Sequence, residues 1–406
     1  MLSKNLLEKP AADPRLWMLD RDIIFLNHGS FGSCPKAVLE FQNQIRTQME
    51  QEPVQFFVRD LEPLLDEART EIAHFLDGIP EQLVFVPNAT YGVNCVLNSL
   101  SFKLGDEILI TNHEYNACKN AVNVVAEKSG AKVVVARIPF PLKRTDEISA
   151  SIFSSVTERT KLIMIDHVTS PTGLAFPVEE IVKKAKTTGI PVLIDGAHTA
   201  GMLPLSLKKL DADFYTGNCH KWLCSPKGSA FLYVKKQWID KIRPIAISHG
   251  ANSPRTDRSR YLIEFGWTGT HDPSPYLSVP MAIKYLESLV DGGWQTIMAR
   301  NRALALAARN MICTHLEIEP PAPDDMIGSM AAFRIWNSSI NEPPKTALYS
   351  DALQNKLMEK YKIEVPVAPW ENYPQRTLRI SAQLYNYLEQ YEILAKALKE
   401  LRNKNY

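Results

Sequence analysis

The chain has 406 residues, of which 45% are hydrophobic and 22% are charged, a composition typical of a globular protein with one large domain or two domains. Its 46 basic and 45 acidic residues give a formal net charge of +1, so it lacks the basic excess that binds nucleic-acid phosphates. No apolar run approaches the roughly 18 residues of a membrane helix, the N-terminus lacks the apolar core of a signal peptide, and six scattered cysteines without a CxxC pair are typical of reduced thiols. We therefore expect a cytoplasmic protein with neither a nucleic-acid nor a membrane partner.

Helices are predicted first along the chain, and a strand-rich region follows them. Apolar residues at helical spacing predict helices over residues 36–51 and 61–76. Short apolar runs then alternate with helix-capable segments, which indicates a parallel sheet covered by helices on both faces. The seven runs are QLVFVPN, DEILITN, KVVVARI, KLIMIDHV, IPVLIDGAH, ADFYTG and SAFLYV. A tight turn is predicted at SPKG, between the last two.

The alternation of predicted strands and helices ends after GWTGTHDPSP, whose last residue is 275. Helices are predicted over residues 276–290 and 294–316, followed by strands near MAAFRIW, IEVPV and TLRIS and by a closing helix. We therefore predict a large α/β domain over residues 31–275 and a smaller α+β domain over residues 276–406. Residues 1–30 are predicted to pack with the small domain.

Polar side chains follow five of the predicted strands, close to the point where each strand ends. Because ligands of open parallel sheets bind at the carboxyl ends of the strands, we expect these side chains to form one site. They are Asn88, Thr90, Glu114, Tyr115, Ser170, Asp195, His198, Asn218, His220 and Lys221.

An apolar strand that ends in Asp195, with Lys221 further along, indicates a particular cofactor. Pyridoxal phosphate needs an amine to form an aldimine and a carboxylate to keep its ring nitrogen protonated. Its phosphate needs donors, which the N-terminus of a helix supplies, and NATYGVN fits with Ala89 and with the Thr90 hydroxyl. An aromatic ring over the cofactor would hold it flat, and Tyr115 is placed to do so. Taken alone, Lys221 has the alternative interpretation of a solvated lysine, and Asp195 that of a helix-capping residue.

Several ordered motifs together resemble the class V aminotransferase family, which has fold type I of the pyridoxal phosphate enzymes. They are FLNHGSFGSCP, NATYGVN, TNHEYNA, HVTSPTG, LIDGAHTAG, GNCHKWLCSPKG, GWTGTHDPSP and LRISAQLYN. The resemblance runs from about residue 23 to 387 and is greatest to the isopenicillin N epimerase-like branch. It implies a mainly parallel seven-stranded sheet with helices on both faces, plus the smaller α+β domain.

For the cofactor, the resemblance implies a covalent bond at Lys221, a ring-nitrogen partner at Asp195 and a stacking ring at Tyr115, all three taken as catalytic. His198 would lie near the ring hydroxyl. The other implied cofactor contacts are Ala89, Thr90, Ser170, Asn218, His220 and Thr270. Ser170 stands where desulfurases carry an Asn, and Thr270 would reach the phosphate of the neighbouring subunit, which implies a homodimer with shared active sites.

For the substrate, the resemblance implies an amino-acid-like small molecule. Arg379 would grip its carboxylate bidentately, with a structural ion pair as the alternative, and Asn27 and His28 would line the pocket. The cluster Arg255, Arg258 and Arg260 is either a second carboxylate site or, as we favour, a surface or dimer contact.

The reaction is less well specified than the cofactor. Epimerisation at Cα is favoured, with Tyr115 or His28 as the second proton donor; transamination, C–S lysis and a non-catalytic cofactor-binding protein are the alternatives. Persulfide chemistry is disfavoured, because Cys313 is the last cysteine and the later loop has none. A zinc site at Cys219, His220 and Cys224 is disfavoured by its spacing, and no metal is predicted.

Overall fold

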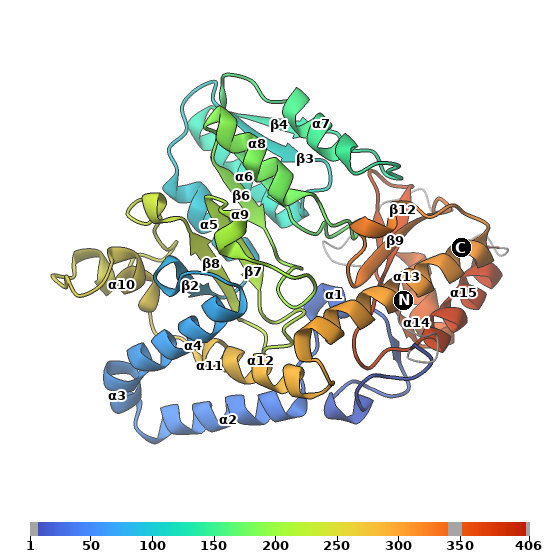
Figure 1. Ribbon diagram of the computed structural model, residues 1–406, viewed down its shortest axis with the longest axis horizontal. Helices are drawn as coiled ribbons and strands as arrows, with labels where there is room; N and C mark the ends of the chain where they lie inside the picture. Colours follow the sequence, from blue (N-terminus) through green and yellow to red (C-terminus); the bar gives the residue numbers. More distant parts are fainter. Residues whose placement is uncertain (1–6, 340–350, 403–406) are drawn as a thin grey trace.

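The computed structural model describes residues 7–339 and 351–402, and a seven-stranded sheet lies at its centre (Figure 1). The strand order is β2-β8-β7-β6-β5-β3-β4. Strand β8 pairs antiparallel with both β2 and β7, so the other six strands run in one direction. All seven predicted strands are present: β2 (Leu83–Val86), β3 (Glu107–Thr111), β4 (Lys132–Ala136), β5 (Thr160–Asp166), β6 (Val192–Asp195), β7 (Phe214–Asn218) and β8 (Ala230–Val234).

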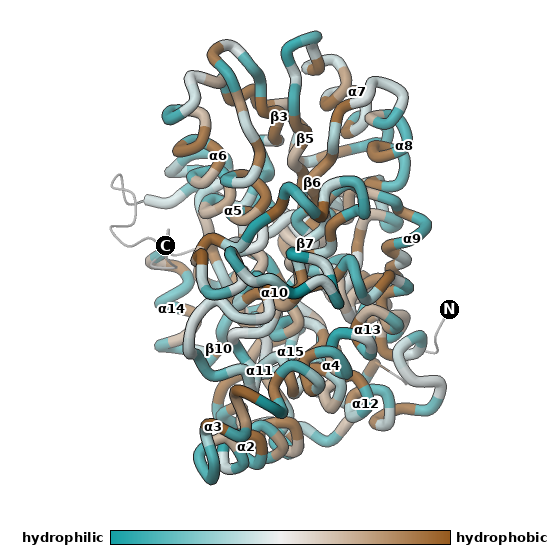
Figure 2. The backbone as a smooth tube through the Cα atoms, turned by 90° about the vertical axis from the view of Figure 1, so that its left-hand side faces the viewer, coloured by the Kyte–Doolittle hydropathy of each residue, from teal (hydrophilic) through white to brown (hydrophobic). Residues whose placement is uncertain are grey.

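Helices cover both faces of this sheet, as a buried parallel sheet requires. One apolar core lies between the strands and three helices, which are α5 (Ala89–Ser99), α6 (Asn116–Ser129) and α10 (Arg260–Gly266). The core on the other face involves α4 (Leu61–Phe75), α7 (Asp146–Ser154), α8 (Val178–Thr188) and α9 (Leu207–Leu210). Figure 2 shows the hydrophobic colours concentrated along β3, β5 and β6.

The helices next to the sheet follow the predicted spacing, with one difference. Helix α2 (Lys36–Gln51) has the predicted bounds, after which α3 (Pro53–Gln55) leads toward α4. The single helix predicted over residues 276–290 is two helices, α11 (Ser274–Leu277) and α12 (Val279–Ser288). Pro280 explains the break, because it has no N–H to donate to the preceding turn and is tolerated only where a helix begins.

The C-terminal part packs on a separate apolar core and contains a small sheet of order β11-β12-β9. Its strands are β9 (Met330–Ile335), β11 (Val367–Pro369) and β12 (Arg376–Ser381), and its helices are α13 (Gly293–Leu316), α14 (Ala352–Tyr361) and α15 (Leu388–Arg402). Within residues 7–339 and 351–402, none of the helices has both the length and the apolar character needed to cross a membrane.

The N-terminal segment joins the C-terminal part through a short parallel pair of strands. The run IEVPV, predicted as one strand, splits at Pro366, which cannot donate to a strand ladder. Its first half, β10 (Ile363–Glu364), pairs with β1 (Ile24–Phe25), while β11 pairs with β12. The domain boundaries at residues 30 and 275 stay a prediction.

Candidate active site

Lys221 lies just beyond the end of β7, in the loop that leads to β8. Its Nζ atom is 3.2 Å from Nε2 of His198, which follows β6. Burial, and next the positive charge of Arg379, lower the pKa of Lys221 to about 7, although Asp195 opposes this shift. The structure therefore holds an amine with a substantial uncharged fraction at neutral pH, which a nucleophilic lysine requires.

Asp195 is the last residue of β6 and is 2% exposed. Its Oδ1 accepts a hydrogen bond from the Ala197 backbone N–H at 2.9 Å, and its Oδ2 accepts one from the Cys118 thiol at 3.2 Å. Burial raises the pKa of Asp195, and the nearby Lys221 charge lowers it. The structure therefore places the predicted amine and the predicted carboxylate at one end of the sheet.

The N-terminus of α5 meets the end of β7, as the predicted phosphate contacts require. The Ala89 backbone N–H donates to Oδ1 of Asn218 at 2.9 Å, and Asn88 caps the helix by accepting from the Tyr91 N–H at 2.9 Å. Thr90 lies half-buried in the first turn. The Ala89 N–H is thus used within the protein, while the side chain of Thr90 lies in the first turn of α5 and that of Asn218 at the end of β7.

Arg379 joins three parts of the chain, although it lies on β12 in the C-terminal part. It is 4% exposed and donates through Nη1 to the backbone carbonyl and, at 3.2 Å, to the hydroxyl of Ser170. Its Nη2 donates to the Ser30 hydroxyl at 3.1 Å, and Ser30 in turn donates to Oδ1 of Asn27 at 2.5 Å. The predicted substrate residues Arg379 and Asn27 are therefore close together, with Ser170 between Arg379 and the sheet.

His28 has a different environment from the predicted pocket position. Its Nε2 is 2.9 Å from the Lys221 carbonyl oxygen and its Nδ1 is 2.7 Å from the Tyr385 hydroxyl. A carbonyl oxygen only accepts, so Nε2 donates to Lys221 and Nδ1 accepts from Tyr385. Burial lowers the pKa of His28 to about 3. This geometry favours a structural role, in which His28 holds the backbone of Lys221 in place.

Gly32, in the N-terminal segment, packs against the loop that carries Lys221. Its φ is +69°, and a Cβ atom built there would lie 1.9 Å from the His220 carbonyl oxygen and 2.9 Å from Cα of Lys221. The contact leaves no space for a side chain, so the backbone of the N-terminal segment packs directly on the lysine loop.

Tyr115 and Thr270 are both exposed. Tyr115 precedes α6 and is 39% exposed. Thr270 lies in the loop that follows α10, and its predicted contact with a neighbouring subunit stays a prediction. His220, in the lysine loop, has its Nδ1 3.0 Å from the Ser229 carbonyl oxygen, so its Nε2 is the nitrogen left for a ligand.

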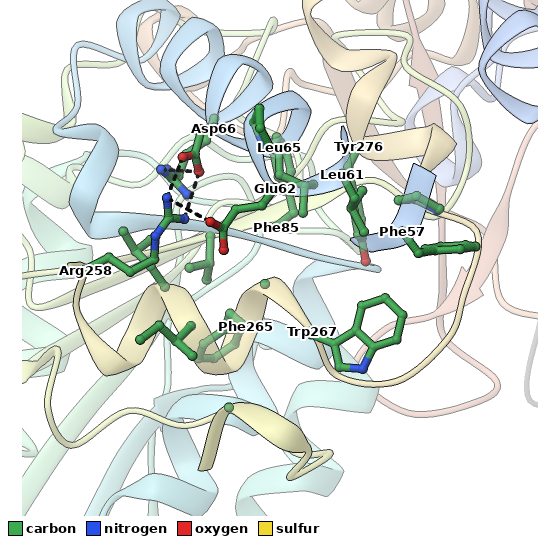
Figure 3. Close-up of a pocket in the computed structure, with 18 of the residues that line it drawn as sticks. Phe57, Leu61, Glu62, Leu65, Asp66, Phe85, Arg258, Phe265, Trp267 and Tyr276 are labelled. Atoms are coloured by element: carbon green, nitrogen blue, oxygen red, sulfur yellow. Dashed lines mark hydrogen bonds and ion pairs between the residues drawn. The ribbon is translucent and has the colours of Figure 1, made fainter. Parts of the chain in front are cut away.

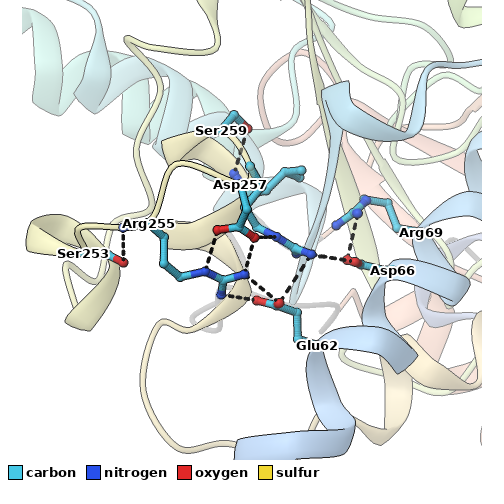
Figure 4. A network of polar contacts seen from close by, with 9 residues as sticks. Glu62, Asp66, Arg69, Ser253, Arg255, Asp257 and Ser259 are labelled. Carbon is cyan, nitrogen blue, oxygen red and sulfur yellow. Dashed lines mark hydrogen bonds and ion pairs between the residues drawn. The ribbon is translucent and has the colours of Figure 1, made fainter.

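The three arginines of residues 255–260 are paired with acidic groups, and Figure 4 shows the contacts of Arg255 with Glu62 and Asp257. Arg255 contacts Glu62 at 2.8 Å and also Asp257. Arg258 contacts Asp66 at 2.9 Å, and Arg260 contacts Glu264 at 3.2 Å. This network favours the interpretation as a surface cluster.

A cavity of about 440 Å³ lies beside this network (Figure 3). Its wall is rich in aromatic rings, among them Phe57, Phe85, Trp267 and Tyr276. Arg255 and Arg258 line it, whereas Lys221 and the residues predicted to bind the cofactor do not. The cavity is therefore separate from the candidate active site.

A family model described as "Aminotransferase class-V" matches residues 33–342, which is most of the chain. The chain belongs to the class V aminotransferase family. It is 32% identical to the isopenicillin N epimerase of Streptomyces clavuligerus over 95% of the chain and 96% of that protein. It is 28% identical to a probable chloroplastic L-cysteine desulfhydrase of Arabidopsis thaliana, over 94% and 83% respectively.

The fold of this class V protein matches solved structures of the same class of enzymes. One is C-DES with glycine covalently linked to its PLP cofactor, with a TM-score of 0.76, 20% identity and coverage of 94% of this chain and 97% of the other. Fold type I and the cofactor, pyridoxal 5'-phosphate, are therefore confirmed.

The side chains of this class V protein fit the cofactor. An amine of lowered pKa at Lys221 and a buried carboxyl at Asp195 are the groups that its aldehyde and ring nitrogen need. Nδ1 of His198 is buried without a hydrogen-bond partner among the described residues, and a ring hydroxyl is a suitable partner for it. The individual roles stay predictions.

Cofactor attachment is expected to depend on pH through Lys221. Only the uncharged amine attacks an aldehyde, so the attachment rate should rise about tenfold per pH unit below the pKa and level off above about 7. In Arg379→Met the cationic neighbour that lowers the pKa of Lys221 is absent. The midpoint of the plot of attachment rate against pH should therefore move to higher pH. Stopped-flow absorbance after mixing the cofactor-free chain with pyridoxal phosphate measures both profiles. An unchanged midpoint in Arg379→Met would contradict the assigned coupling.

Some side chains of this site were not predicted, among them Ser30, Cys118 and Asp166. Cys118, on α6, bonds to Asp195, and Asp166 is the register partner of Asp195 across β5 and β6. A signal for Asp166 was present, because LIMID and VLID both end in Asp. Cys118 had none, since the contact depends on how α6 packs on the sheet.

Proposed function

We propose that this class V enzyme epimerises the Cα of an amino acid or peptide-like substrate with a free α-amino carboxylate. The observation that carries the proposal is the 32% identity with an isopenicillin N epimerase over nearly the full length of both proteins. The site supports it, because Lys221 has the pKa of a general base near neutral pH. The bound cofactor supplies a cationic ring that withdraws electrons from Cα.

Substrate binding and proton transfer are assigned to residues of the chain. Arg379, oriented by Ser170 and Ser30, binds the substrate carboxylate. Lys221 removes the Cα proton, and a second group returns a proton from the opposite side. Of the two predicted donors, Tyr115 is accessible, whereas His28 is buried with both ring nitrogens engaged. Tyr115 is therefore the proposed donor.

We extend the proposal to the assembly. Thr270 lies exposed on the surface of its own subunit, where a neighbouring chain can reach it. A homodimer in which Thr270 contacts the phosphate of the neighbouring site is the proposed arrangement.

C–S lysis of a cysteine-like substrate is the second candidate. The 28% identity with an L-cysteine desulfhydrase favours it. Both reactions begin when Lys221 removes the Cα proton, so the residues around this lysine suit either. Persulfide transfer remains disfavoured, because Cys313 is buried in α13, in the core of the C-terminal part.

Substrate incubation in deuterated water distinguishes the reactions. The cofactor-loaded chain is expected to place deuterium at Cα and to remove the optical purity of an accepted substrate, as seen by NMR and chiral chromatography. Sulfide or keto-acid release without loss of optical purity would contradict epimerisation and favour the other candidates.

The Tyr115→Phe variant tests the second donor. With Lys221 intact, it should still exchange the Cα proton with retention, while epimerisation falls by about 10²–10⁴-fold, the usual contribution of a general acid or base. Equal losses of exchange and epimerisation would contradict the role of Tyr115.

A further inference from the structure

Three carboxyl groups are buried at the carboxyl ends of β3, β5 and β6. Glu114 follows β3 and is 7% exposed, while Asp166 and Asp195 end neighbouring strands and are each 2% exposed. The ligand-type atoms of Glu114, Cys118 and Asp195 all lie within 4.8 Å of one another. Like charges at such distances in a buried place disfavour ionisation of all of them, so the negative charge is unequally distributed among these groups.

The hydrogen bonds of Glu114 and Asp195 indicate how the charge is distributed. Asp195 accepts from the Ala197 N–H and from the Cys118 thiol. Both carboxyl oxygens of Glu114 are buried, and among the described residues neither accepts a hydrogen bond of good geometry; the Tyr115 backbone N–H opposes the rise of the Glu114 pKa only in part. A buried carboxylate that lacks well-formed hydrogen bonds is far more costly than a neutral acid. The charge therefore belongs on Asp195 and the proton on Glu114.

The titration of the cluster agrees with this distribution. Burial, and next the charge of Asp195, hold the pKa of Glu114 well above its usual range, against the Tyr115 backbone N–H. The pKa of Asp195 is also raised by burial, but the positive charge of Lys221 opposes that rise. Burial, together with its acidic neighbours Glu114 and Asp195, also holds the pKa of Asp166 well above its usual range, so the negative charge on Asp195 disfavours ionisation of both other carboxyl groups.

We propose that Glu114 is a positioning residue, which remains a neutral carboxylic acid beside Asp195 and leaves Asp195 with the negative charge. The inference deepens the proposed function, since it rests on Asp195 as the partner of the cofactor ring. As a consequence, the site presents a single carboxylate to the ring nitrogen. This carboxylate is Asp195, which hydrogen bonds from Ala197 and Cys118 hold in position. Glu114 acts through Asp195 and needs no contact with substrate.

Two substitutions that replace a carboxyl with an amide of the same shape, Glu114→Gln and Asp195→Asn, test which carboxyl is charged. Pyridoxal phosphate affinity of the full chain at neutral pH is expected to change by no more than about threefold in Glu114→Gln, because one neutral group replaces another of the same shape. Asp195→Asn should weaken it by about tenfold or more, because it removes a buried ion-pair partner. The exposed Glu127 on α6 supplies the matched control, Glu127→Gln, with wild-type affinity. Loss of affinity in Glu114→Gln with retention in Asp195→Asn would overturn the proposal.

Infrared spectroscopy of the cofactor-loaded wild-type chain provides a test that requires no mutation. A neutral carboxylic acid has a C=O stretching band distinct from that of a carboxylate, and incorporation of ¹³C-labelled glutamate shifts the band of Glu114 but leaves that of Asp166. We expect a label-sensitive neutral-acid band at neutral pH, which is absent in Glu114→Gln and present in Glu127→Gln. Absence of this band in the labelled wild type would overturn the inference. Neither measurement uses turnover, so failure of the epimerase proposal leaves both results interpretable.

Discussion

Replacement of Lys221 with Ala is expected to abolish covalent attachment of the cofactor and to reduce turnover by about 10²–10⁴-fold or more, the contribution of a general base. The physical reason is that the variant removes the partly buried amine whose pKa is lowered to about 7. Borohydride reduction of the loaded protein, followed by mass mapping of its peptides, measures the attachment directly. The wild type should carry the modification on the peptide that contains residue 221.

A second lysine of the same loop provides the control. Lys227 donates to the Gly32 carbonyl oxygen at 3.1 Å, so Lys227→Ala changes the loop without removing the proposed nucleophile. It should retain the absorbance of the attached cofactor and the modified peptide. Attachment that survives in Lys221→Ala would assign the covalent bond to another amine and exclude Lys221.

Replacement of Gly32 with Ala should have a large effect on stability and on the site together. The backbone of Gly32, with φ of +69° and ψ of 172°, lies in a region essentially limited to glycine and costs another residue about 1–3 kcal/mol, and the clash with the His220 carbonyl adds about 1–3 kcal/mol of overpacking. The expected loss is about 2–6 kcal/mol in the free energy of unfolding, measured by chemical denaturation. Cofactor attachment should fall as well, because the lysine loop must move to make room for the methyl group.

Gly189 offers a control with the same φ but without the contact. Its φ is also +69°, with ψ of 14° in the left-handed helical region, and nothing lies within 4 Å of a Cβ built there. Gly189→Ala should therefore show the conformational cost of roughly 1–2 kcal/mol alone, with normal cofactor attachment. Equal losses for the two variants would show that the contact between Gly32 and the lysine loop is unimportant.

The fold could be predicted in detail because its signals are local. The apolar runs around Leu109 and Ile163 and the spacing of residues 36–51 are visible in the sequence, and the ordered motifs predict the class V family. The differences arise at prolines, Pro280 and Pro366, where a continuous apolar pattern conceals a change of element.

The site could be predicted only in part, because its details depend on tertiary contacts. Lys221 and Asp195 were identifiable as a pair, and the structure brings them to one end of the sheet. The engagement of both ring nitrogens of His28 depends on Tyr385, 357 positions away. The lack of a well-formed hydrogen bond to Glu114, within the part of the chain that the structure describes, likewise depends on tertiary packing, which the spacing of residues in the sequence does not predict.

The pairing of β1 with β10 has a consequence for biosynthesis. The segment that carries His28 and Gly32 is synthesised long before its hydrogen-bonding partners, since residues 363–364 pair with β1 and Tyr385 follows His28 by 357 positions. The supports of the loop around Lys221 are therefore complete only after these later residues have been synthesised. A nascent chain released before that point would carry the reactive amine without the framework that orients it.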